Sequence, residues 1–144
     1  MSGPNPDGRG EPTATLHGLE YVSTPKAPQS RAPLSQAVIS DDLVFTAGLV
    51  GVNPQTGQLA EGIEAQTRQT LDNLAAVLTA AGSSLTHAIK VTIFVRDVGL
   101  LAQVNTVYGE FFTRPWPARS ALEARMADDK ILVEIEVVAR RTAG

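Results

Sequence analysis

The stretch "AIKVTIFV", at residues 88–95, decides the fold class of this chain. Isoleucine and valine occupy every second position, and the positions between them hold Lys90, Thr92 and Phe94. A period of two is typical of a β-strand whose two faces differ in burial. We expect a central strand here, with both faces partly covered.

Helical periodicity precedes and follows this strand. Over residues 64–81 leucine and alanine recur at helical spacing, and Gly82 is placed to cap the helix C-terminus. After the strand, Asp97 is a suitable N-cap for a second helix. The apolar stripe expected on that second helix comprises Leu101, Val104, Tyr108 and Phe112.

Short apolar runs supply the other strands. They are "LEYVS" (19–23), "QAVIS" (36–40), "LVFTAG" (43–48), "ARSALEARM" (118–126) and "ILVEIEVVA" (131–139). The polar "ADDK" between the last two is short enough for a hairpin. The order β-β-β-α-β-α-β-β predicts an α/β (α+β) fold with a six-stranded sheet and two helices on one face. The other face then needs a partner, which predicts oligomerisation.

The composition is that of one globular domain, since 144 residues with 43% hydrophobic residues support a single core. We expect residues 1–18 to be a flexible polar tail and residues 19–144 to be the domain. No apolar run approaches the roughly 20 residues that span a bilayer. The N-terminal residues contain no apolar leader, so we expect a soluble, cytoplasmic protein with no membrane partner.

Charge and residue types exclude several classes of function. The chain has no cysteine, which excludes disulfides, thiolate catalysis and cysteine-based zinc sites. The net charge is −3 and the 12 basic residues do not cluster, so we expect no nucleic-acid partner. His17 and His87 lie far apart and outside any ligand-like spacing, so we expect no metal.

Two charged residues of the last two strands suggest chemistry. Alternation predicts that Arg119 and Glu134 share one face, and a slipped hairpin register makes them diagonal neighbours. A guanidinium can hold a carboxylate with two hydrogen bonds, and a carboxylate can orient water or move a proton. The alternative is an ordinary solvated charged face. Asn105, on the second helix, is similarly either a solvated residue or a ligand-binding one.

Seven segments, in this order, resemble the RidA family, also called the YjgF/YER057c/UK114 family, of reactive enamine/imine deaminases. The resemblance runs from about Val22 to Arg140. It implies a chorismate-mutase-like fold and a homotrimer whose sheets form a barrel, with active sites at the subunit interfaces. The segments are "APLSQAV", "AGLVGVNPQTG", "QTRQTLDNLAAVLTAAG", "KVTIFVRDV", "VNTVYGEFF", "PARSALE" and "VEIEVVA".

The resemblance also implies roles for individual residues. Arg119, in "PARS", corresponds to the arginine that binds the substrate carboxylate. Glu134, in "VEIE", corresponds to the glutamate associated with the water that attacks the imine. Asn105, in "VNTVY", lies at the site, and Gly48 offers backbone contacts. No metal or organic cofactor is implied.

Four positions depart from the usual pattern of the family. Many relatives carry tyrosine, serine, glutamine and cysteine where this chain has Leu34, Ala47, Leu49 and Ala121. The resemblance places these residues around the non-carboxylate end of the substrate. A wall without hydroxyl, amide or thiol groups favours apolar imino acids. The alternative is that they pack the trimer interface.

The expected activity is cofactor-independent hydrolysis of 2-aminoacrylate-derived or other small 2-imino acids to 2-keto acids and ammonia. This corresponds to a 2-iminobutanoate/2-iminopropanoate deaminase-like hydrolase. One alternative is a trimeric ligand-binding or holdase-like protein with weak turnover, and another is a pathway-specific deaminase for a larger apolar substrate. An endoribonuclease or translation inhibitor is disfavoured, because no basic patch supports it.

Overall fold

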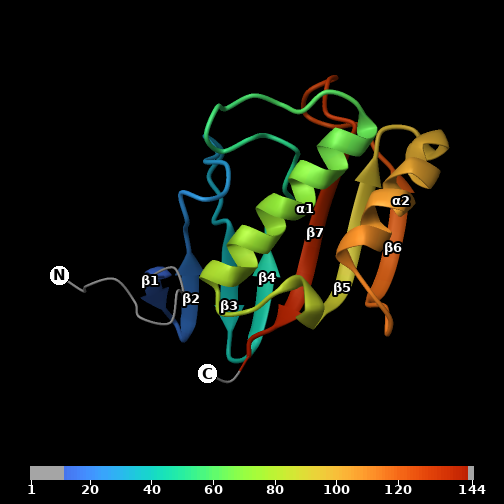
Figure 1. The fold of residues 1–144 in the computed structure, drawn as a ribbon. Coiled ribbons are helices and arrows are strands. Elements are labelled where there is room, and N and C mark those ends of the chain that lie inside the picture. The colour runs from blue at the N-terminus through green and yellow to red at the C-terminus, as the bar shows by residue number, and fades with distance from the viewer. Residues whose placement is uncertain (1–11, 143–144) are drawn as a thin grey trace.

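Two helices lie side by side on one face of a seven-stranded sheet in the computed structural model, which describes residues 12–142 (Figure 1). The helices are α1 (Ile63–Ala80) and α2 (Leu101–Phe111), and the short 3-10 helices η1 (Leu85–His87) and η2 (Val98–Leu100) flank β5. The strands are β1 (Pro12–Leu16), β2 (Leu19–Val22), β3 (Ala37–Ser40), β4 (Leu43–Thr46), β5 (Ala88–Val95), β6 (Ala118–Glu123) and β7 (Val133–Arg140).

The predicted helices and the central strand are confirmed. Gly82 adopts a φ of +81° directly after the end of α1, and the Asp97 side chain accepts a hydrogen bond from the Gly99 backbone in η2. The core lies between the helices and the sheet. Its fully buried side chains include Leu71, Leu74 and Leu78 of α1, Val91 and Ile93 of β5, and Ile135 of β7.

The predicted number of strands was wrong by one, because residues 12–16 were assigned to the flexible tail. They form β1, which pairs antiparallel with β2. The connection is a tight turn in which His17 and Gly18 both have positive φ, as a two-residue hairpin requires. "PTATL" has too few apolar residues to show as a strand. Residues 1–11 of the expected tail lie outside the described residues.

The expected hairpin of the last two strands was also wrong. The sheet order is β1-β2-β3-β4-β7-β5-β6, so β7 lies between β4 and β5, while β6 occupies the edge, parallel to β5. Parallel neighbours need a crossover connection, which α2 supplies between β5 and β6. Strand β7 has a fully buried apolar face under α1, which suits a position with a neighbour on each edge.

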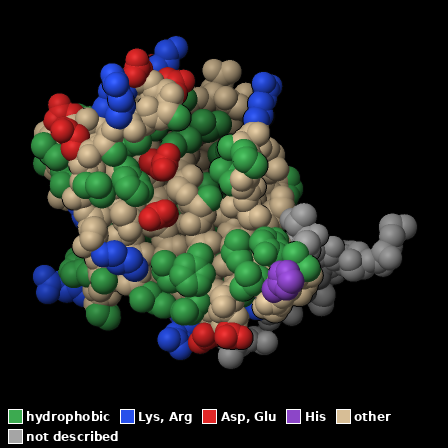
Figure 2. Space-filling view, turned by 180° about the vertical axis from the view of Figure 1, so that it is seen from behind, with side chains coloured by type: hydrophobic (Ala, Val, Ile, Leu, Met, Phe, Trp, Pro, Cys, Tyr) green, Lys and Arg blue, Asp and Glu red, His purple; other side chains and the backbone are tan. Residues whose placement is uncertain are grey.

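The opposite face of the sheet carries no helix among the described residues. Glu134 and Glu136 point to it, because they alternate along β7 with the buried Val133, Ile135 and Val137. Figure 2 shows acidic side chains near the middle of this face, with hydrophobic side chains around them. Phe45 and Leu122 on this face are each 44% exposed.

Candidate active site

Arg119 lies on the helix side of the sheet, at the edge strand β6. Its register partner is Val91, whose side chain is buried beneath the helices. The Arg119 Nη2 donates a hydrogen bond to Asn105 Oδ1 of α2 at 2.5 Å. The guanidinium carbon lies 4.7 Å from the centre of the Tyr108 ring, within cation–π range. Two contacts from one helix therefore fix the direction of the guanidinium.

Tyr108 belongs to the candidate site, although the sequence pattern indicated only a place in the apolar stripe of the helix. Its ring stacks on Phe112 with centroids 4.3 Å apart, and burial raises the pKa of its hydroxyl, which keeps the ring neutral under the cation. Its one sequence signal was its spacing of three residues from Asn105 on one helix face. A cavity of about 300 Å³ opens beside Arg119, lined by Asn105, Tyr108, Gly109, Trp116, Pro117 and Arg119.

Glu134 lies on the opposite side of the sheet, beside Gly48. A Cβ atom at residue 48 would stand 2.5 Å from Glu134 Oε2, so glycine lets this carboxylate keep its position, and a side chain there would displace it. Burial raises the pKa of Glu134 above its ordinary value, and the neighbouring charge of Glu136 raises it further. A carboxylate with a raised pKa is a stronger base, which suits it to accept a proton from water.

The prediction that Arg119 and Glu134 share one face was wrong. Strand β5 lies between β6 and β7. Arg119 of β6 pairs with Val91 of β5, and Glu134 of β7 pairs with Phe94 of β5. These two β5 residues point to opposite faces. The structure thus brings Arg119 together with Asn105, and Glu134 together with Gly48, but it separates the two pairs within one chain.

The four positions that depart from the family pattern do not form one wall within a single chain. Leu49 is 8% exposed and pairs with Ile135 in the ladder, so its side chain belongs to the core and not to a pocket. Ala121 is exposed on the Arg119 side of β6. Leu34 lies on a loop, where it is 49% exposed. The Ala47 amide donates a hydrogen bond to the backbone carbonyl of Gln36, near the same loop.

Among residues 12–142, no three histidine, cysteine, aspartate or glutamate side chains are grouped as a metal site would need. None of the described helices combines the length and the apolar character needed to cross a membrane.

Comparison with known proteins gives consistent results. The sequence model of the family described as endoribonuclease L-PSP matches residues 24–141. A RutC family protein of Pyrococcus horikoshii is 41% identical over 121 residues, which cover 83% of this chain and 96% of that protein. The 2-iminobutanoate/2-iminopropanoate deaminase of Escherichia coli (strain K12) is 37% identical over 123 residues, covering 83% of this chain and 96% of the relative.

A solved structure agrees in fold. The crystal structure of Escherichia coli TdcF with bound serine superposes with a TM-score of 0.79 at 34% identity, covering 85% of this chain and 98% of that chain. The matched region includes both candidate pairs of residues, Arg119 with Asn105 and Glu134 with Gly48. The chain therefore belongs to the endoribonuclease L-PSP family, which is the RidA (YjgF) family that its motifs resemble.

Proposed function

We propose that the protein hydrolyses 2-imino acids to 2-keto acids and ammonia without a cofactor. The observation that carries this proposal is Arg119, whose guanidinium is oriented by Asn105 and Tyr108 at the mouth of a cavity. The relatives named as deaminases support the reaction class, and the serine in a solved relative supports an amino-acid-like ligand.

The reaction needs one carboxylate anchor and one group that moves protons. Arg119 holds the substrate carboxylate with two hydrogen bonds, which fixes the imine carbon in place. Glu134 accepts a proton from water as the water oxygen bonds to that carbon. Glu134 returns this proton to the nitrogen as the carbon–nitrogen π bond opens, which gives a carbinolamine. The carbinolamine hydroxyl then gives up its proton, which passes through Glu134 to the same nitrogen. The carbonyl forms as the remaining carbon–nitrogen bond breaks, and ammonia leaves with the 2-keto acid as the other product.

These two roles lie on opposite faces of one chain, so the proposed site combines residues of two chains. Arg119 lies on an edge strand, and the Glu134 face carries exposed apolar side chains that no helix of residues 12–142 covers. A closed ring of subunits brings one chain's edge against the next chain's open face at every interface. We propose a homotrimer of this kind, with one site per interface.

The assembly has a direct test. Because the open sheet face carries exposed apolar side chains and the family resemblance implies a trimer, light scattering should give about three times the chain mass of 15.2 kDa. A monodisperse monomer at micromolar concentration would rule out both the trimer and a site shared between chains.

The Glu134 pKa predicts a pH effect. As a general base, Glu134 must be deprotonated, so kcat/KM rises with pH through its raised pKa. Glu136→Gln removes one of the two causes of that raised pKa, so the acidic limb of the kcat/KM profile should move to lower pH. Glu61→Gln, an exposed carboxylate in a loop, is the matched control and should leave the limb in place. An unmoved limb in Glu136→Gln would mean that another group controls it.

A further inference from the structure

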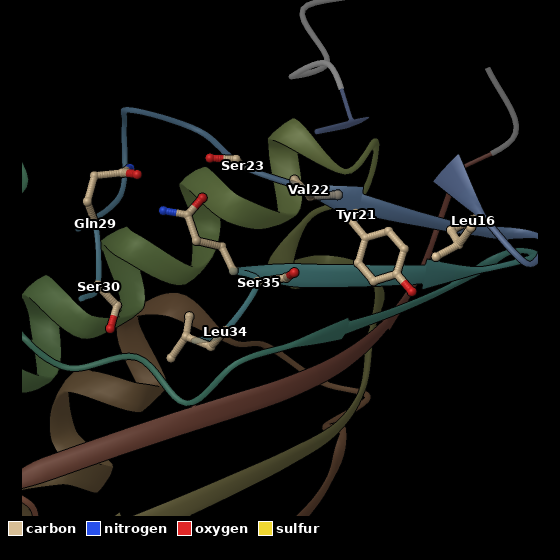
Figure 3. Close-up of a pocket in the computed structure, with 9 residues that line it drawn as sticks. Leu16, Tyr21, Val22, Ser23, Gln29, Ser30, Leu34 and Ser35 are labelled. Carbon is tan, nitrogen blue, oxygen red and sulfur yellow. The ribbon is translucent and has the colours of Figure 1, made fainter. Parts of the chain in front are cut away.

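A second cavity, of about 420 Å³, lies between the β1–β2 hairpin and the loop that leads into β3 (Figure 3). Leu16 at the end of β1, Tyr21 of β2 and Leu34 of the loop form its apolar wall. Leu16 and Leu34 are 56% and 49% exposed, so each presents much of its side chain to this space. An exposed cluster of this kind is typical of a ligand-binding surface.

The loop that walls this cavity is held in one shape by Gln36. This side chain is 6% exposed, and its Oε1 accepts a hydrogen bond from the Thr24 amide at 2.6 Å. Its Nε2 donates to the carbonyl oxygens of Thr24 and Pro28. Gln29 adds a bond from its Nε2 to the Thr24 carbonyl at 2.9 Å. A loop fixed by a buried amide presents a preformed cavity, which reduces the entropy lost on binding.

The cavity is connected by direct contacts to the Glu134 side of the proposed site. The backbone amide of Ala47 donates to the carbonyl of Gln36, two residues beyond Leu34. Gly48, next along the chain, packs against the Glu134 carboxylate. Ala47 and Gly48 therefore connect the loop of the cavity to the Glu134 carboxylate, and a ligand held at Glu134 would extend along them toward Leu34.

The chemistry of the wall selects an uncharged occupant. None of the described lining residues carries a charge, and Leu16, Tyr21 and Leu34 provide apolar contact area. Ser23, Ser30 and Ser35 add hydroxyl groups around it, as Figure 3 shows. A methyl or ethyl substituent would leave most of 420 Å³ empty, whereas drug-sized ligands occupy cavities of roughly 300–1,000 Å³.

We propose that this cavity binds the side chain of the imino acid, and that the preferred substrates carry a bulky, uncharged, mainly apolar side chain, aromatic or branched aliphatic. This inference rests on the proposed deamination. It assigns substrate selection to Leu16 and Tyr21, which precede the family match at residues 24–141. The β1 wall is thus a feature of this chain outside the matched family region.

The test measures binding and turnover separately. Binding of pyruvate and phenylpyruvate, the 2-keto acid products of a small and a bulky substrate, is measured by calorimetry on the full-length protein. Turnover is measured as kcat/KM for the imines that an amino-acid oxidase generates from alanine and phenylalanine. We expect phenylpyruvate to bind more tightly and the phenylalanine-derived imine to be the better substrate.

Leu16→Asp tests the wall itself. Leu16 is exposed on the outermost hairpin, so the fold should tolerate the change, while a charge in the cavity opposes an apolar side chain. The preference for phenylpyruvate over pyruvate should fall by at least about tenfold, which corresponds to about 1.4 kcal/mol, because the phenyl ring loses its apolar contact and meets a charge instead. Val98→Asp, at another exposed apolar residue outside this cavity, is the matched control and should keep the wild-type preference.

The outcomes separate the two proposals. Equal binding of both keto acids by the wild type, or an unchanged preference in Leu16→Asp, overturns the side-chain cavity. If no imine is turned over, the proposed deamination is overturned. In that case the cavity is still supported if the wild type binds phenylpyruvate more tightly than pyruvate and Leu16→Asp loses this preference. Turnover of both imines with no preference overturns the cavity and supports deamination.

Discussion

Replacing Arg119 with alanine is expected to lower kcat/KM for 2-imino acids by about 10²-fold or more, a few kcal/mol of transition-state stabilisation. The guanidinium is held between Asn105 and the Tyr108 ring, so its direction is fixed before a ligand arrives. Alanine removes both the charge and the two-pronged hydrogen bonding. Steady-state kinetics on imines generated by an amino-acid oxidase measure the loss.

Two further variants make the Arg119 result specific. Arg119→Lys should recover little activity, because an ammonium group reproduces neither the planar fork nor the stacking on Tyr108. Arg68→Ala is the matched control, since its exposed ion pair with Glu110 contributes little to stability and lies outside the proposed site. Thermal unfolding should show each variant folded. Wild-type turnover in folded Arg119→Ala would contradict the proposed carboxylate anchor.

The local elements were predictable because their sequences carry strong periodic signals. A helical period over residues 64–81 predicts α1, and a period of two over residues 88–95 predicts β5. Both elements lie within about one residue of the expected bounds. Strand β1 was not predictable in this way. Its five residues, "PTATL", do alternate Ala14 and Leu16 with threonine, but the run is short and continues a segment rich in Gly and Pro. Its pairing with β2 across the His17–Gly18 turn is what makes it a strand.

The sequence indicates which residues are candidates for the site, but it does not indicate how they are arranged. Alternation within a strand correctly separates faces, yet it cannot say which strands are neighbours. The short "ADDK" segment favoured a hairpin, whereas the crossover through α2 places β6 beside β5 and leaves β7 in the middle of the sheet. The whole error in placing Arg119 beside Glu134 follows from that one pairing. The Gly48–Glu134 contact joins residues 86 positions apart, and nothing local in the sequence indicates it.

Replacing Glu134 with glutamine is expected to lower kcat by about 10² to 10⁴-fold, the usual contribution of a general acid–base group. The same change should not destabilise the fold. The pKa of Glu134 is higher in the folded chain than in the unfolded one, so the folded state binds more protons and stability falls as pH rises through this interval. Above the raised pKa of Glu134 the cost of burying its charge is fully present, and neutral glutamine removes that cost. Thermal unfolding at pH 7 should give an equal or higher Tm.

A mixing experiment tests whether Glu134 and Arg119 act across a subunit interface. Arg119→Ala and Glu134→Gln are each nearly inactive alone, but a chain with intact Arg119 can adjoin a chain with intact Glu134 in a mixed assembly. If the two variants are unfolded and refolded together in equal amounts, about one quarter of the interfaces combine both intact residues, so about one quarter of wild-type activity should return. Mixing without refolding is the control. A refolded mixture as inactive as its parents would place both residues in separate sites, because opposite faces of one sheet cannot meet within a single chain.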